Sequence, residues 1–214
     1  MLRTETVSPG TLELLKKLMQ DRALGQFFLV GGTALSLQIG HRISIDIDLF
    51  SITAFEENKL AEYLGSEYGL RLAYLDKNTI KGQVDNVQVD LITHAYPLVK
   101  DAASVDGVRM AGLEDIAAMK LNAIIGNGTR LKDFIDIAFL SQYLSLEDMT
   151  DAYEKKYNIR NAVMTLKALA WHNDINFDEP ISYVHRACSW KHIEARLAQM
   201  IRYPERTFHG PPGS

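Results

Sequence analysis

The sequence has a single cysteine and no long apolar run. Cys188 has no partner for a disulfide within the 214 residues, and no Cys/His pair lies at zinc-ligand spacing, which argues against a disulfide scaffold and a zinc site. No stretch of about 18 apolar residues is present to span a bilayer, and residues 1–7 lack the apolar centre of a signal peptide. These absences predict a cytoplasmic protein that makes no membrane contact.

The chain also lacks a strong excess of charge of either sign. Its formal net charge is -4, with 23% charged and 47% hydrophobic residues. A mildly acidic balance argues against a protein that coats nucleic acid non-specifically, although it does not exclude a local basic surface. The composition is typical of a folded soluble chain that forms one ordinary domain or two small ones.

Two adjacent glycines follow a short apolar segment near the N-terminus. Residues 27–30 are apolar, Gly31, Gly32 and Thr33 come next, and residues 34–39 have the spacing of a helix. Glycines at the start of a helix let the backbone approach a ligand closely, with free N–H groups pointing at it. The segment therefore predicts a strand, a turn and a helix whose start suits a phosphate.

A second segment places two carboxylates one residue apart. Apolar and polar residues alternate from position 43 to position 50, which predicts a strand. The alternation assigns its apolar residues to the core: Ile43, Ile45, Ile47 and Leu49. Ser44, Asp46 and Asp48 then share the other face, where like charges are tolerated mainly in solvent or beside a divalent cation. A metal site is one interpretation, and an Asp-x-Asp on the wet face of an edge strand is the other.

The glycine turn and the acidic strand together resemble the signature of the AbiEii/AbiGii toxin family of nucleotidyltransferases, within the polymerase-beta-like superfamily. The resemblance rests on residues 31–35 and 40–50. In that superfamily a Gly-Gly or Gly-Ser turn at a helix start precedes two acidic residues on the next strand. A third acidic residue follows on a later strand.

Asp90 is the candidate for the third acidic residue. Residues 79–84 and 87–92 read as two strands joined by Asp85-Asn86, whose residues tolerate the positive φ of a tight hairpin. Alternation turns Asp90 away from Val89 and its apolar neighbours, so one carboxylate is isolated on an otherwise apolar strand. The alternative is a solvated aspartate on an edge strand.

A lysine and two aspartates lie on predicted helices later in the chain. Lys120 falls within or beside the apolar stripe of its helix, which is an unusual place for a lysine. One interpretation is that its aliphatic stem packs on the apolar residues while its ammonium group reaches water. Residues 130–140 are similar to the family's Lys-Asp-x-x-Asp helix, and Asp133 and Asp136 are neighbours on one face. Buried acids need a cation, for which Lys120, Arg130 and Lys132 are available. The cluster either contacts nucleotide or joins two helices structurally.

The predicted fold class is α+β, a small mixed sheet with flanking helices of nucleotidyltransferase type followed by a helical C-terminal half. We expect a nucleotidyltransferase core over residues 1–110, a helical region over 111–208 and a flexible tail over 209–214. Ser8-Pro9 predicts a helix start, and the strands that follow position 71 are expected to end near Ile92. Further helices are predicted over residues 55–68, 113–125, 130–143, 146–156, 161–171 and 193–202.

The resemblance implies a role for each candidate residue. Asp46, Asp48 and Asp90 would bind two Mg²⁺ ions, and Asp90 would help activate the attacking hydroxyl. Gly31, Gly32 and Thr33 would cradle the β- and γ-phosphates of an NTP. Arg42 would grip the same phosphates or pair with one of the nearby aspartates. Lys120 would approach the phosphates or base of the nucleotide, and Asp133 would orient that lysine or contact the ribose.

The resemblance also implies an activity and partners. The enzyme would move an NMP from an NTP to an acceptor hydroxyl and release pyrophosphate. The leading acceptor is RNA, at a tRNA 3′ end, with the protein acting as the toxin of a toxin-antitoxin or phage-defence module with a cognate antitoxin. A protein or an aminoglycoside-type small molecule is an alternative acceptor. A catalytically idle nucleotide-binding regulatory module is the alternative of another class.

Overall fold

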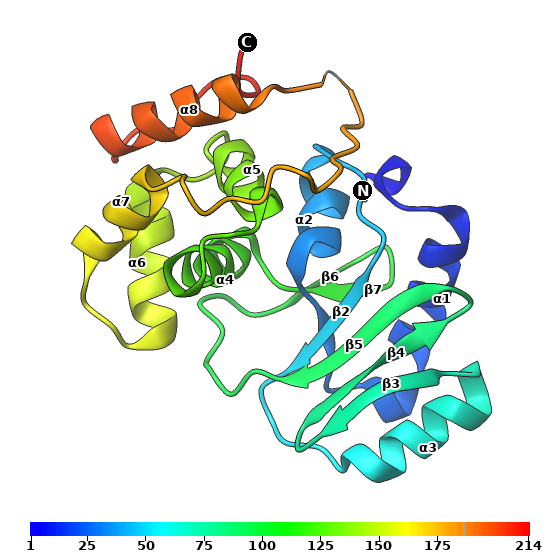
Figure 1. Ribbon diagram of the computed structural model, residues 1–214. Coiled ribbons are helices and arrows are strands. Elements are labelled where there is room, and N and C mark those ends of the chain that lie inside the picture. Colours follow the sequence, from blue (N-terminus) through cyan, green and yellow to red (C-terminus); the bar gives the residue numbers. More distant parts are fainter. Residues whose placement is uncertain (186) are drawn as a thin grey trace. The chain divides into compact units, whose positions relative to one another are not determined.

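The computed structural model describes residues 1–185 and 187–214, which fold into two compact units (Figure 1). The strand unit consists of Met1–Pro97 and Asp101–Ala111, and the helical unit consists of Leu98–Lys100 and Gly112–Ser214. Every described strand belongs to the strand unit, so the predicted mixed α/β fold class is confirmed. In the part of the chain that the structure describes, no helix is long and apolar enough to cross a membrane.

The strand unit begins with helices and then alternates between helices and strands. Its elements are, in chain order, the 3-10 helix η1 (Thr4–Thr6), α1 (Pro9–Gln20), the 3-10 helix η2 (Arg22–Leu24), β1 (Phe28–Leu29), α2 (Gly31–Ile39), β2 (Ile47–Ser51), α3 (Glu57–Tyr68), β3 (Arg71–Asp76), β4 (Thr79–Val84), β5 (Val87–Thr93), β6 (Ala103–Val105) and β7 (Val108–Met110).

The helical unit contains the remaining elements. They are α4 (Leu113–Gly126), α5 (Leu131–Leu140), α6 (Leu146–Tyr157), α7 (Ala162–Ala170) and α8 (Trp190–Arg202). The helices predicted from apolar spacing are all confirmed, with ends that differ by a few residues, as is usual where a helix frays.

The ends of the helices follow from local chemistry. The Ser8 side chain accepts a hydrogen bond from the N–H of Thr11 at 3.0 Å, and Pro9 occupies the first position of α1, so the predicted helix start is confirmed. Helices α2 and α3 end at Gly40 and Gly69, whose φ angles are 73° and 66°. Glycine adopts this left-handed conformation without the clash that a Cβ causes, so both helices stop there.

The seven strands form one mixed sheet in the order β3-β4-β5-β2-β1-β7-β6. Strand β2 pairs parallel with β5, and β1 pairs parallel with β7, whereas the other neighbours are antiparallel. The predicted hairpin is confirmed, since Asp85 and Asn86 join β4 and β5 with φ angles of 47° and 67°. The run of strands that begins at Arg71 ends at Thr93, close to the expected Ile92, but a short hairpin that was not predicted, β6-β7, adds two strands at the far edge.

The segment before β2 departs from the predicted alternation. Strand β2 begins only at Ile47, and Ile45, expected in the core, is 62% exposed. Ser44 is buried instead, because its N–H bonds the carbonyl of Thr6 at 2.9 Å rather than a sheet neighbour. Residues 43–46 therefore do not pair with a neighbouring strand as part of β2, and the alternation with a period of two holds only from Ile47 onward.

The sheet has one apolar and one polar face across β4, β5 and β2. Ile80, Leu91 and Leu49 pair across these strands and are completely buried. Helix α3 packs on β3 and β4, and Leu70, which follows it, lies against Gly82 on this apolar face. Lys81, Asp90 and Asp48 alternate with the buried row and therefore project from the opposite face. One face of the sheet builds the core, and the other is left for polar chemistry.

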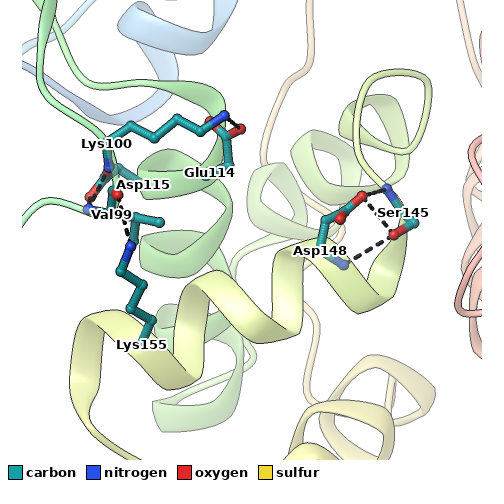
Figure 2. A network of polar contacts seen from close by, with 7 residues as sticks. All are labelled: Val99, Lys100, Glu114, Asp115, Ser145, Asp148 and Lys155. Atoms are coloured by element: carbon teal, nitrogen blue, oxygen red, sulfur yellow. Dashed lines mark hydrogen bonds and ion pairs between the residues drawn. The ribbon is translucent and has the colours of Figure 1, made fainter.

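A buried aspartate organises the helical unit. Asp115, in the first turn of α4, accepts hydrogen bonds from the N–H groups of Val99 and Lys100 at 3.0 and 3.1 Å (Figure 2). Its Oδ1 also lies 2.8 Å from Nζ of Lys156, which is buried with it. Lys155 donates to the Val99 carbonyl at 3.2 Å (Figure 2). These contacts tie the segment Leu98–Lys100 to α4 and α6.

The end of the chain makes hydrogen bonds with α8. The guanidinium of Arg196 donates to the carbonyl oxygens of Gly210 and Pro211, each at 3.2 Å. These two residues belong to the segment 209–214 that was expected as a flexible tail. In the structure, Arg196 anchors it to the helix.

We predict that Asp115→Ala strongly destabilises the protein. The substitution leaves the Lys156 ammonium buried without its carboxylate and removes the acceptor of two main-chain N–H groups. Loss of one partner of a buried ion pair typically costs about 3–5 kcal/mol. Urea unfolding followed by circular dichroism measures the change.

The neighbouring residue provides the control. Glu114 pairs with Lys100 at the surface, where solvent and salt screen such pairs and they contribute little to stability. Glu114→Ala should therefore change the free energy of unfolding far less than Asp115→Ala does. Equal losses in the two variants would show that Asp115 does not organise this unit.

Candidate functional site

Two of the three candidate acids lie side by side on the polar face of the sheet. Parallel pairing of β2 and β5 places Asp48 directly opposite Asp90. Both are half-buried, and β5 lies between β4 and β2, so Asp90 is not on an edge strand. The structure thus brings together two carboxylates from separate segments of the chain.

Two polar side chains hold Asp90. Nζ of Lys81, on β4, lies 2.8 Å from its Oδ2, and Nε2 of Gln88 donates to its Oδ1 at 2.8 Å. Sequence reasoning missed both partners, although the hairpin contained the signal. A two-residue turn at 85–86 sets the register of β4 against β5, and counting back from the turn puts Lys81 opposite Asp90.

Asp46 differs in environment from the other two acids. It lies just before the first residue of β2, and its side chain is exposed. Its main-chain carbonyl accepts a hydrogen bond from the hydroxyl of Thr33. Helix α2 therefore fixes the backbone at Asp46, while the carboxylate points into solvent.

The two adjacent glycines bring charged side chains against the start of α2. Gly31 has a φ of 69°, and a Cβ built on it would overlap Oδ2 of Asp48. A Cβ on Gly32 would lie 2.5 Å from Nη2 of Arg42. Only glycine leaves room for the carboxylate and the guanidinium beside this backbone. The sequence predicted the close approach of a ligand, and the structure shows two of the protein's own side chains at this place.

Arg42 and Thr33 are both buried beside this turn. Nη1 of Arg42 donates to the Ile43 carbonyl at 3.2 Å. The Thr33 hydroxyl, besides bonding the Asp46 carbonyl, lies 2.9 Å from Oγ of Ser44. The Thr33 side chain is thus engaged inside the protein, and it joins α2 to the segment that leads into β2.

The arrangement of the acids decides how they could hold magnesium. Among residues 1–185 and 187–214, no group of three or more His, Cys, Asp or Glu side chains is arranged to hold a metal ion. Mg²⁺ is, however, usually bound by one or two carboxylates together with substrate phosphates. Asp48 and Asp90, paired across two strands beside the Gly31-Gly32 turn, suit that mode.

The helical unit holds the remaining candidates in a buried ion-pair cluster. Nζ of Lys120 lies 2.6 Å from Oδ1 of Asp133 and 2.8 Å from Oδ2 of Asp136. All three side chains are buried. Of the partners expected for these acids, Lys120 is therefore confirmed, whereas Lys132 pairs with Glu179 at 2.8 Å.

Asp133 is distinguished from Asp136 by a neighbouring cavity. A cavity of about 330 Å³ is lined by Asp133, Arg130 and the loop between α4 and α5. Asp136 is completely buried and does not line this cavity. Lys120 can thus be anchored by Asp136 while Asp133 faces a space of ligand size.

The chain is similar to nucleotidyltransferase toxins in sequence. The model of the family described as "Nucleotidyl transferase AbiEii toxin, Type IV TA system" matches residues 13–69 and 69–202. The uncharacterized protein aq_aa25 of Aquifex aeolicus (strain VF5) is 30% identical over 168 residues, which cover 76% of this chain and 81% of that protein.

A solved structure has a similar fold. The crystal structure of JHP933 from Helicobacter pylori superimposes with a TM-score of 0.53 at 17% identity, and the match covers 93% of each chain.

We predict that Gly31→Ala destabilises the protein. A non-glycine residue in the left-handed conformation costs about 1–2 kcal/mol, and the new methyl group would displace the Asp48 carboxylate. The melting temperature should fall accordingly. Gly126→Ala is the matched control, since a Cβ there meets nothing within 4 Å. A Gly31→Ala protein as stable as Gly126→Ala would contradict the close contact with Asp48.

Proposed function

The chain belongs to the AbiEii nucleotidyl transferase toxin family, and on that premise we propose that it transfers an NMP from an NTP to an acceptor hydroxyl, releasing pyrophosphate in a Mg²⁺-dependent reaction. The observation that carries the proposal is the register of β2 and β5, which places Asp48 opposite Asp90 beside the Gly31-Gly32 turn.

The acids supply negative charge where the triphosphate and the acceptor meet. Asp48 and Asp90 are the proposed ligands of Mg²⁺, and Asp46 is a third ligand by family resemblance. Bound Mg²⁺ would lower the pKa of the acceptor hydroxyl and neutralise charge on the pyrophosphate that leaves. Asp90 helps to activate the hydroxyl, as the family resemblance implies. The protein contributes position and electrostatics, so no covalent nucleophile is required.

The start of α2 binds the β- and γ-phosphates in this proposal. Its first N–H groups, at Gly31, Gly32 and Thr33, have no partner within the helix and carry the positive end of its dipole. Arg42 adds a positive charge beside Gly32. Because the Thr33 hydroxyl is engaged with the Asp46 carbonyl, Thr33 contributes through its backbone.

Lys120 and Asp133 bind nucleotide by family resemblance. The ammonium of Lys120 is held between two carboxylates, which fixes where a phosphate or a base would meet it. Asp133 orients the lysine and lies at the wall of a cavity. The cluster also joins α4 to α5, so its structural and functional roles are compatible.

We propose RNA as the acceptor, at a 3′ end such as that of tRNA, and a toxin role opposed by a cognate antitoxin. The description of the family as a toxin of a type IV toxin-antitoxin system supports the role. A protein or a small molecule remains an alternative acceptor, and an idle nucleotide-binding module remains the alternative of another class.

We predict Mg²⁺-dependent transfer of label from an α-labelled NTP to cellular RNA. The purified protein is incubated with each NTP in turn, with total RNA and protein, and the products are separated by gel. Asp48→Asn keeps the size of the side chain and removes its charge, so transfer should fall by about 100-fold or more. Asp101→Asn, at an exposed site of the strand unit, should retain full activity.

The destination of the label separates the alternatives. Label on RNA supports the proposed acceptor, and label on protein replaces it with a protein acceptor. Label on an added aminoglycoside selects the small-molecule reaction. Absence of any transfer with all four NTPs, from a folded protein that binds NTP, would favour the idle module.

We also predict that Asp133→Asn and Asp136→Asn have different effects. Asp133 lines a cavity, so Asp133→Asn should weaken NTP binding severalfold, measured by calorimetry, in addition to the loss of stability that follows from its buried contact with Lys120. Asp136 is completely buried beside Lys120, so Asp136→Asn should lower stability by about 3 kcal/mol or more. Identical profiles in binding and in urea unfolding would assign the whole cluster to structure.

A further inference from the structure

The polar face of the sheet continues from the paired acids to the sheet's edge. Across β3, β4 and β5 the paired residues are Tyr74, Lys81 and Asp90, and Asp90 in turn pairs with Asp48 on β2. Residues paired across neighbouring strands project from the same face. One row of side chains therefore joins the edge strand to the candidate site.

A second row runs beside the first. Arg71, Gln83 and Gln88 pair across β3, β4 and β5. The Arg71 guanidinium donates to Gln83 Oε1 at 3.4 Å and to Asn86 Oδ1 at 3.0 Å, so it lies over the β4-β5 hairpin. Gln88 connects the two rows, because its amide donates to Asp90.

A β-bulge in the edge strand brings Arg71 and Tyr74 to one face. The register of β3 against β4 shifts between Leu72 and Tyr74, so Ala73 is the extra residue. In a regular strand, positions 71 and 74 would face opposite ways, because side chains alternate. Bulges are frequent beside active sites, where they redirect a side chain. Here the bulge adds an aromatic ring to a face that already carries a cation.

The face is accessible and its ring is held in place. Tyr74 is 51% exposed, and the side chain of Lys81 is 41% exposed. The Tyr74 hydroxyl donates to Asp76 at 3.0 Å. This bond raises the pKa of Tyr74 above its ordinary value. The Asp76 carboxylate is occupied by that hydroxyl and by the N–H of Lys77.

We propose that this face binds the single-stranded 3′ end of the RNA acceptor, an inference that rests on the proposed function. We name it the acceptor platform, and it consists of Arg71, Tyr74, Lys81, Gln83 and Gln88. Its aromatic ring provides a surface on which a base stacks, its two cations bind phosphates, and its amides bond base edges. Three interstrand spacings, about 14 Å, separate the two ends of the first row. That length suits about four stacked nucleotides at about 3.4 Å each.

Lys81 is the positioning residue of the platform. Its ammonium lies 2.8 Å from Asp90 and is partly exposed, so it can bind a phosphate of the acceptor while it remains close to that carboxylate. A strand held in this way ends with its 3′ hydroxyl near Asp90 and Asp48. Lys81 thus acts on the reaction through the placement of the acceptor.

Binding in the absence of catalysis tests the platform. Fluorescence anisotropy measures the affinity of the full chain for a 5′-fluorescein-labelled RNA of about 12 nucleotides, in EDTA and without NTP. Tyr74→Ala and Arg71→Ala should each weaken binding by about tenfold. Tyr74→Phe keeps the stacking surface and should bind like wild type. Tyr143→Ala, at a tyrosine of the helical unit that is 49% exposed, and Arg22→Ala are the matched controls and should have no effect.

The salt dependence separates the roles of the two side chains. A contact between a cation and a phosphate of single-stranded RNA contributes about 0.7 to the slope of log affinity against log salt. Arg71→Ala and Lys81→Gln should each reduce the slope by about that amount, whereas Tyr74→Ala should lower the affinity and leave the slope unchanged. A loss of fold would not produce this division, and circular dichroism verifies the fold of each variant.

Other outcomes would overturn the platform without overturning nucleotidyl transfer. Equal RNA affinity in wild type, Tyr74→Ala and Arg71→Ala would place the acceptor elsewhere. Absence of RNA binding together with label on protein would replace RNA by a protein acceptor and leave the transfer activity standing. Platform-dependent RNA binding without incorporation of any NTP would instead reject the proposed function alone.

Discussion

The parallel pairing of β2 with β5 is the constraint on which the candidate site depends. It sets Asp48 opposite Asp90, although a helix and two strands separate them along the chain. Two adjacent carboxylates repel, so the surrounding structure must stabilise them. Lys81 and Gln88 hold one of the pair, and the other lies against Gly31 at the positive end of α2. The register of β4 against β5 brings Lys81 to Asp90, whereas Gln88 precedes Asp90 on the same strand and Gly31 comes from α2.

Buried ion pairs have a comparable role in the helical unit. Lys156 with Asp115, and Lys120 with Asp133 and Asp136, are removed from solvent. Such pairs add little net stability, because desolvation of the charges offsets much of their attraction. Their geometric effect is larger, since an unpaired buried charge is costly and each partner is therefore confined. The Asp115 network fixes the segment Leu98–Lys100, and the Lys120 cluster joins α4 to α5.

The two faces of the sheet have different roles in the strand unit, since one forms the core and the other carries the candidate site. Leu49, Leu91 and Ile80 form a buried apolar row on one face. On the opposite face, a row of polar side chains runs from Asp48 and Asp90 to the edge strand β3. The bulge at Ala73 adds the side chain of Tyr74 to the polar face. Without it, Tyr74 would project from the apolar side, where α3 packs. A single inserted position thus determines whether the face ends in an aromatic ring.

Local patterns in the sequence determined most elements, because capping, glycine and the period of apolar residues act over a few positions. The start of α1 at Ser8, the hairpin at Asp85 and Asn86, and the outward direction of Asp90 are of this kind. Only the tertiary structure decided that Ser44 is buried and Ile45 exposed, because the bond from Ser44 to Thr6 joins distant segments. It also decided that Lys120 pairs with both aspartates, that Lys132 does not, and that β6 and β7 complete the sheet. Such contacts depend on which segments meet, and composition and periodicity carry no information about that.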